Sequence, residues 1–182
     1  MDTVVEQQDG TRRVFQERLT LYHANSQGTG AAVQLEPRIN RRAGERYNCF
    51  FLEMAPQKTA QMRTESGLTP ATFDWERKIT VKLNFMDICE LLAVLEGESD
   101  HVGGGRDGLY HQTGEANTII RFCLHDAGGY RLALSRKCTA SGEVFRVGTV
   151  LSRKEAIGLR HIFQAGLFFV TLPMASHGLC AA

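Results

Sequence analysis

The chain has 182 residues, of which 43% are hydrophobic and 23% charged, the balance of a globular protein with room for one core. No apolar run approaches the ~20 residues of a membrane span, and the acidic N-terminal residues lack the hydrophobic segment of a signal or transit peptide. The 21 Lys and Arg against 20 Asp and Glu leave a formal net charge of +1, so overall charge neither favours nor excludes nucleic acid as a partner.

Alternation of apolar and polar residues predicts four strands in the first half of the chain. After a flexible tail over residues 1–13, the alternation runs through residues 14–24, 31–38 and 48–55. Residues 57–71 are interpreted as a polar loop, and residues 73–83 have the cleanest strand pattern. On that pattern Trp75 belongs to the core, and Arg77 pairs with a carboxylate or extends to the sheet margin.

The hydrophobic period then changes from that of a strand to that of a helix. Asn84 is a suitable N-cap, one apolar stripe follows, and Gly97 ends the helix. A glycine-rich link over residues 98–108 comes next. This predicts one ββββα unit over residues 14–97.

The same order of elements is predicted a second time. Strands are expected over residues 109–111, 116–125, 130–137 and 143–150. Ser152 and Glu155 have the spacing of a capping box, and Pro173 ends the helix before a C-terminal tail over residues 174–182. The second unit therefore covers residues 108–173.

The two units favour an internal duplication. Leu21-Tyr22-His23 and Leu109-Tyr110-His111 occupy matching places in them. We expect an α+β fold in which two four-stranded antiparallel sheets, each with one helix, pack around a shared core. Residues 14–173 would form a single domain made of both halves.

Several strings have counterparts in a known family. They are Gly28-Thr29-Gly30-Ala31-Ala32-Val33 with Glu36-Pro37-Arg38, Phe50-Phe51-Leu52-Glu53-Met54-Ala55-Pro56, Phe73-Asp74-Trp75-Glu76-Arg77-Lys78, Leu109-Tyr110-His111 and Leu172-Pro173. Over roughly residues 17–173 the chain resembles the Whirly family of single-stranded DNA-binding proteins. One ββββα half also has a more distant likeness to coactivators of the positive cofactor four type.

The resemblance to the Whirly family implies a fold and a function. It implies two packed sheets braced by helices, tetramers built through those helices, and binding of single-stranded DNA along the sheets with little sequence preference. The chain departs from the family at Gly28 and Gly30, which stand where the family motif has lysines linked to DNA binding and higher assembly. We expect the positive charge to lie instead on Arg38, Arg41, Arg42 and Arg46.

Candidate binding residues follow from what a single strand requires. Cations must follow the phosphates and flat rings must stack on bases, and alternate strand residues share one surface. In the first half, Tyr22, Arg38, Lys78 and Lys82 are expected to share one open electropositive groove. The full set of candidates is Tyr22, His23, Gln34, Arg38, Lys78, Lys82, Tyr110, His111, Arg121, Arg131 and Lys137, with Arg146 as additional charge.

Each candidate also has a structural interpretation. The two tyrosines can be cross-strand packing partners, and the two histidines can make packing or hydrogen-bonding contacts. The lysines can form the solvated face of an edge strand. These alternatives stay open at the level of sequence.

The second helix carries a candidate interface between copies of the chain. Ile157 and Phe168 project from its far side beside His161. An exposed apolar pair is unusual for a monomer, so we expect a buried contact in a homo-oligomer, with a tetramer favoured by the resemblance.

The preferred function is non-enzymatic binding of single-stranded DNA, with RNA left open as a second ligand, in DNA maintenance, repair or transcription. The alternative is an oligomeric scaffold that has lost nucleic-acid binding. No nucleophile motif or compact metal-ligand set is present, so we expect no catalytic residue, metal or cofactor. The five scattered cysteines indicate reduced thiols and a cytoplasmic protein, associated with the nucleoid if the host is bacterial.

Overall fold

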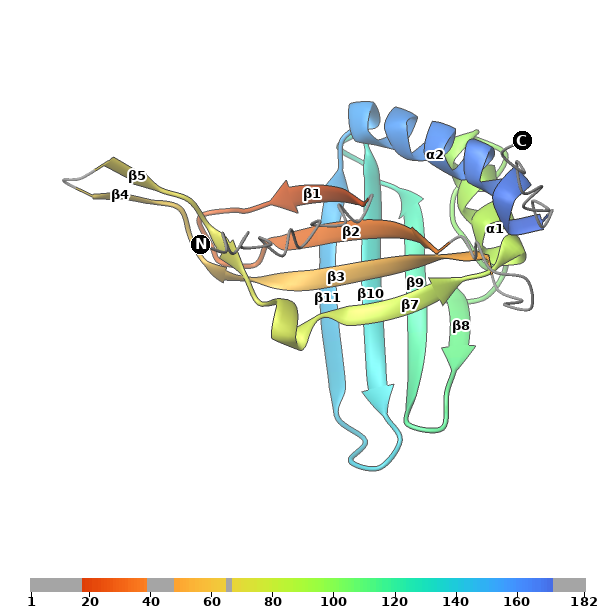
Figure 1. Cartoon of the computed structure of the whole chain (residues 1–182), viewed down its shortest axis with the longest axis horizontal. Coiled ribbons are helices and arrows are strands. Elements are labelled where there is room, and N and C mark those ends of the chain that lie inside the picture. Colours follow the sequence, from red (N-terminus) through yellow and green to blue (C-terminus); the bar gives the residue numbers. More distant parts are fainter. Residues whose placement is uncertain (1–17, 39–47, 65–66, 172–182) are drawn as a thin grey trace, which may run out of the picture.

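Two antiparallel sheets cross over one hydrophobic core, with both helices at one end of the molecule (Figure 1). The computed structural model describes residues 18–38, 48–64 and 67–171. The expected α+β fold is confirmed, although the strands are divided differently. The expected tails and the predicted cations Arg41, Arg42 and Arg46 lie outside the described residues.

The first sheet has five strands. They are β1 (Leu19–His23), β2 (Ala31–Arg38), β3 (Cys49–Thr59), β6 (Thr72–Phe73) and β7 (Ile79–Leu83). The order is β1-β2-β3-β6, and β7 pairs with the first part of β3, before the part that pairs with β6. Phe50, Leu52 and Met54 alternate inward on β3, as the sequence pattern predicts.

The predicted continuous strand over residues 73–83 is wrong, because a short 3₁₀ helix, η1 (Trp75–Arg77), interrupts it. Asp74 caps this turn by accepting from the Arg77 backbone N–H. A helical turn resets the two-residue alternation, so the inward position expected for Trp75 is also wrong. Trp75 is half-buried beside polar residues, and Arg77 lies over the ring of Phe145 instead of beside a carboxylate.

A hairpin replaces the loop expected over residues 57–71. Strand β3 continues to Thr59, and β4 (Met62–Thr64) pairs with β5 (Gly67–Thr69). This arm projects away from the two sheets (Figure 1). Its few, exposed residues lack the apolar face that would have made a strand recognisable in the sequence.

The second sheet has the order β11-β10-β9-β8, which is a simple meander. Its strands are β8 (Leu109–Gln112), β9 (Ala116–Leu124), β10 (Tyr130–Cys138) and β11 (Val144–Leu151). All four lie within a residue or two of the predicted bounds. One face is buried and the other is open, as the alternation requires.

The two helices begin at the capping signals found in the sequence. Helix α1 (Phe85–Leu95) starts after Asn84, whose side chain accepts from the backbone N–H of Asp87. Helix α2 (Arg153–Thr171) starts after Ser152, which contacts Glu155. Among the described residues, neither helix is long and apolar enough to cross a membrane.

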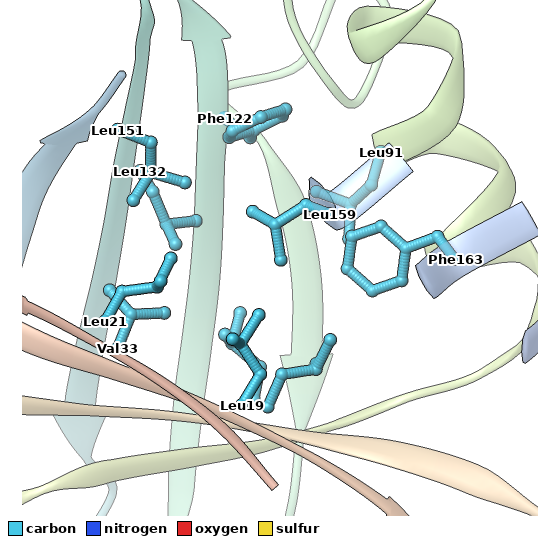
Figure 2. Close-up of a pocket in the computed structure, with 11 residues that line it drawn as sticks. Leu19, Leu21, Val33, Leu91, Phe122, Leu132, Leu151, Leu159 and Phe163 are labelled. Carbon is cyan, nitrogen blue, oxygen red and sulfur yellow. The ribbon is translucent and has the colours of Figure 1, made fainter. Parts of the chain in front are cut away.

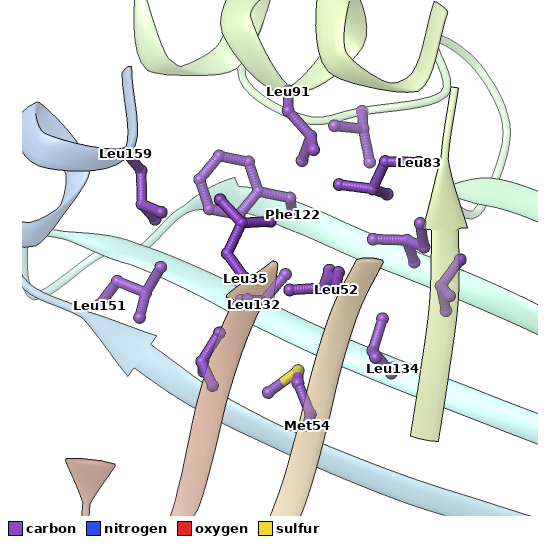
Figure 3. Close-up of a cluster of buried hydrophobic side chains, with 14 of the residues drawn as sticks. Leu35, Leu52, Met54, Leu83, Leu91, Phe122, Leu132, Leu134, Leu151 and Leu159 are labelled. Carbon is purple, nitrogen blue, oxygen red and sulfur yellow. The ribbon is translucent and has the colours of Figure 1, made fainter. Parts of the chain in front are cut away.

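The core lies between the sheets and under both helices (Figure 3). Leu35, Leu52 and Met54 of the first sheet meet Leu132 and Leu134 of the second. A void of about 20 Å³ remains between the sheets and α2, lined by apolar side chains that include Leu19 and Phe163 (Figure 2). An apolar void of this size offers no polar partner to a ligand.

Candidate functional site

A polar groove opens on the outer face of the first sheet. Cross-strand pairing places Thr20, Gln34 and Glu53 in one row, because each is the register partner of the next. The hollow measures about 250 Å³. We define the polar groove by its lining residues, which are Arg18, Thr20, Tyr22, Gln34, Glu53, Trp75 and Lys78.

Glu53 is the centre of a hydrogen-bonded network on the floor of the groove. The residue is 8% exposed. Its carboxylate accepts from Lys78 Nζ at 2.8 Å, Thr80 Oγ1 at 2.9 Å and Gln34 Nε2 at 3.3 Å. A buried carboxylate needs such donors, and here the Lys78 ammonium neutralises its charge. The sequence alternation places Glu53 outward, but only the strand register reveals its partners.

The four residues expected to share one electropositive groove do not do so. Tyr22 and Lys78 line the polar groove together with Gln34, whereas Arg38 and Lys82 lie near Cys49 at the other end of the sheet. Arg38 forms an ion pair with Glu36 at 2.8 Å and lies over Phe51. The charge of this face is thus largely compensated by its own carboxylates.

Both candidate histidines lie on the opposite strand face from their neighbouring tyrosines. His23 Nε2 is 3.2 Å from Glu155 Oε1 in an ion-pair contact that lacks hydrogen-bond geometry. His111 Nε2 is 3.2 Å from Asp87 Oδ1 in a hydrogen bond. Neither side chain reaches the outer faces, which favours the structural interpretation of both.

These two contacts repeat each other across the halves. The first-strand histidine of each half meets the capping carboxylate of the other half's helix. In both carboxylates one oxygen contacts the histidine while the other accepts from the N-cap residue's backbone N–H. The histidine of each tripeptide therefore contributes a contact between the two halves.

The outer face of the second sheet carries a different distribution of charge. Tyr110, Ile119, Ser135 and Arg146 form one row across the four strands. The strands contain no Asp or Glu at all. We define the basic face by its exposed residues Tyr110, Arg131, Lys137 and Arg146.

No carboxylate in the described part of the chain pairs with the cations of the basic face. The neighbouring Arg121 lies on the same side of the sheet, but it binds Asp107 through two hydrogen bonds. That guanidinium lowers the pKa of Asp107 chiefly through the side-chain hydrogen bond. Arg131, Lys137 and Arg146 thus remain available to an external anion.

The structure explains why glycine stands at positions 28 and 30, where the family motif has lysine. Gly28 adopts φ of 72°, which favours glycine. The Gly30 N–H donates to Gln57 Oε1 at 3.1 Å, and a Cβ at this position would overlap Gln57 and the His23 carbonyl oxygen. This turn therefore has no room for a lysine at position 30.

The far side of α2 presents the stripe expected to contact another copy. Ile157 and Phe168 are each 53% exposed, and His161 is also exposed. Gln164, on the same stripe, donates to Glu96 Oε1 at 2.6 Å. The positions are those of the prediction, while the assembly itself stays a prediction.

Two cysteine thiols of the described residues have shifted pKa values. Burial raises the pKa of the Cys49 thiol. A hydrogen bond with the Ser141 side chain lowers the pKa of the half-buried Cys138 thiol. Within the described ranges, no three His, Cys, Asp or Glu side chains are grouped as metal ligands.

Comparison with solved structures identifies the fold. The structure of WHY3 from Arabidopsis thaliana is 17% identical, with a TM-score of 0.64, over 86% of this chain and 89% of that chain. The plant transcriptional regulator PBF-2 is 16% identical, with a TM-score of 0.60, over 85% and 81%. A guide-RNA-binding protein complex bound to a gRNA is 20% identical, with a TM-score of 0.53, over 87% and 94%. No family model and no curated protein matches the sequence. The chain therefore resembles the Whirly proteins in fold.

Proposed function

We propose that this protein binds single-stranded nucleic acid without catalysing a reaction, and that the basic face carries the phosphates. The observation that carries this proposal is the sheet without carboxylates, on which Arg131, Lys137 and Arg146 are exposed and unpaired in the described chain. Phosphate contacts supply most of the sequence-independent affinity for nucleic acid.

Base stacking is the second component of the proposed binding. The Tyr110 side chain is 56% exposed on the basic face, in the same cross-strand row as Arg146. A ring next to phosphate-binding cations is the combination that single-strand binders use, and it tolerates any base. Weak dependence on sequence is therefore part of the proposal.

The similar structures support a nucleic-acid ligand. One of them is a complex bound to a gRNA, and another is named as a transcriptional regulator. We propose single-stranded DNA as the main ligand and RNA as the second, in DNA maintenance or transcription in the cytoplasm.

Fluorescence anisotropy with a labelled oligo-dT and a matching duplex tests this function directly. We expect the single strand to bind more tightly than the duplex and to be released as salt rises. Equal affinity for both, or no binding of either at low salt, would refute the proposal.

Oligomer formation through the far side of α2 is part of the same proposal. Phe168→Glu places a charge among exposed apolar side chains of that stripe, so we expect a smaller particle mass by light scattering. Phe168→Leu keeps this position apolar and is the matched control, which should leave the particle mass unchanged. An unchanged mass in Phe168→Glu would remove this interface.

A scaffold without nucleic-acid binding is the second candidate. It is favoured by the internal ion pairs of Lys78, Arg38 and Arg121, which reduce the charge available to phosphates. The absence of oligo-dT binding together with an intact oligomer would support it.

A further inference from the structure

We propose that the polar groove binds an unpaired nucleobase and excludes the phosphate. This inference rests on the proposed single-strand binding and assigns a ligand to a second surface. The groove and the basic face lie on the outer sides of opposite sheets (Figure 1). A strand therefore reaches both only around an edge of the molecule or between two copies.

The electrostatics of the groove disfavour a phosphate. The Lys78 ammonium lies 2.8 Å from the Glu53 carboxylate and is held there by Coulomb attraction. A phosphate placed against Lys78 would also approach the negative charge of Glu53, and like charges repel. Arg18 also lines the groove, and no described carboxylate pairs with it. A neutral ring meets none of this repulsion.

Two aromatic side chains provide stacking surfaces at the groove. Tyr22 is 65% exposed, yet its ring is held by Phe73, with centroids 5.4 Å apart at 39°. Trp75 lines the same hollow from η1. A ring fixed on one side and open on the other stacks with a base at little cost in side-chain freedom.

The floor of the groove also offers an oriented hydrogen-bond acceptor. Gln34 is 5% exposed, and because its Nε2 donates to Glu53, the position of its Oε1 is fixed. That oxygen is not among the described buried atoms that lack a hydrogen-bond partner, so it is open to the solvent of the groove. The N–H of a base edge can take the place of water there. The volume of about 250 Å³ is below that of pockets for drug-sized ligands, about 300–1,000 Å³, and suits one flat ring system.

Trp75 makes the proposal testable, because it is the chain's one tryptophan. Its fluorescence is followed while the full-length protein is titrated with a single-stranded oligonucleotide. A second oligonucleotide of equal length and charge consists of abasic residues. Anisotropy of a terminal label reports binding of either strand independently of the groove.

We expect both strands to bind at low salt and only the strand with bases to quench Trp75. Equal quenching by the abasic strand, or no quenching at saturation by the strand with bases, would overturn the base pocket while leaving strand binding intact. If anisotropy detects neither strand, the proposed function fails and the pocket assignment fails with it.

Two tyrosine variants form a matched pair for this test. Tyr22→Ala should reduce the quenching at saturation and weaken binding of the strand with bases about 5- to 150-fold, the equivalent of one stacked base. It should leave the affinity for the abasic strand within about twofold. Tyr110→Ala should leave the saturated quenching unchanged. Loss of quenching in Tyr110→Ala alone would assign the effect to the basic face and overturn the proposal.

Discussion

The two halves of the molecule carry the same tripeptide on equivalent strands but surround it with different charge. Around Tyr22, the cation Lys78 is neutralised by Glu53. Around Tyr110, the four strands contain no acidic residue, and Arg146 stands in the same row as the tyrosine. The comparison teaches that a duplicated scaffold can place the same ring beside a neutralised cation on one sheet and beside unpaired cations on the other.

The shared part of the two halves is structural. His23 and His111 each contact the capping carboxylate of the opposite helix, so these contacts depend on both halves being present. The tyrosine next to each histidine points the other way, to an outer face. In each tripeptide the histidine contacts the other half, and the tyrosine before it presents its ring on an outer face.

Removal of the cations of the basic face should have the largest effect on binding. A variant with Arg131, Lys137 and Arg146 all changed to Gln should bind oligo-dT about 100-fold more weakly at 0.1 M salt, at about fivefold per phosphate contact. Anisotropy measures the effect. The matched control is Lys78→Gln with Glu53→Gln, which removes an internally neutral pair and should leave the affinity for an abasic strand, which depends on phosphate contacts alone, within about threefold. Equal losses in both variants would contradict the difference between the faces.

Removal of the Tyr110 ring should weaken oligo-dT binding nearly as much as removal of the three cations. Tyr110→Ala removes an exposed ring and is expected to cost about 1–3 kcal/mol of binding free energy, the value of one stacked base. Tyr110→Phe keeps the ring and should bind like the parent protein. Normal binding by the alanine variant would assign Tyr110 to cross-strand packing.

The histidines should affect stability and not binding. His111→Ala removes a hydrogen bond to Asp87 and should lower the free energy of unfolding by about 1–2 kcal/mol. His23→Ala should cost less, because its contact with Glu155 lacks hydrogen-bond geometry. Urea unfolding measures both. A larger loss in oligo-dT affinity than in stability would show that the histidines contact the nucleic acid.

Much of this architecture could be predicted from the sequence because its signals are local. Alternation defined the meander of the second half, and Asn84 and Ser152 marked both helix starts. The prediction failed over residues 73–83, where the Asp74-capped turn resets the strand period. It also failed over residues 57–71, where an exposed hairpin buries too little apolar surface to leave a pattern.

The candidate surfaces were less predictable because they depend on register and packing. The outward positions of Arg131 and Lys137 follow from alternation alone. The neutralisation of Lys78 depends on β3 pairing with β7, which brings Glu53 beside Thr80. Trp75 could be recognised as a groove residue only once the short turn was known. Local pattern thus identifies faces, whereas tertiary structure determines which of their charges are free.

The salt dependence of oligo-dT binding tests the central claim most directly. The logarithm of the dissociation constant, plotted against the logarithm of salt concentration, should rise by about 0.7 per phosphate contact, and the triple variant should lose about two units of slope. The Lys78 and Glu53 double variant should keep the parent slope. A flat plot for the parent protein, or an unchanged slope in the triple variant, would contradict phosphate binding on the basic face.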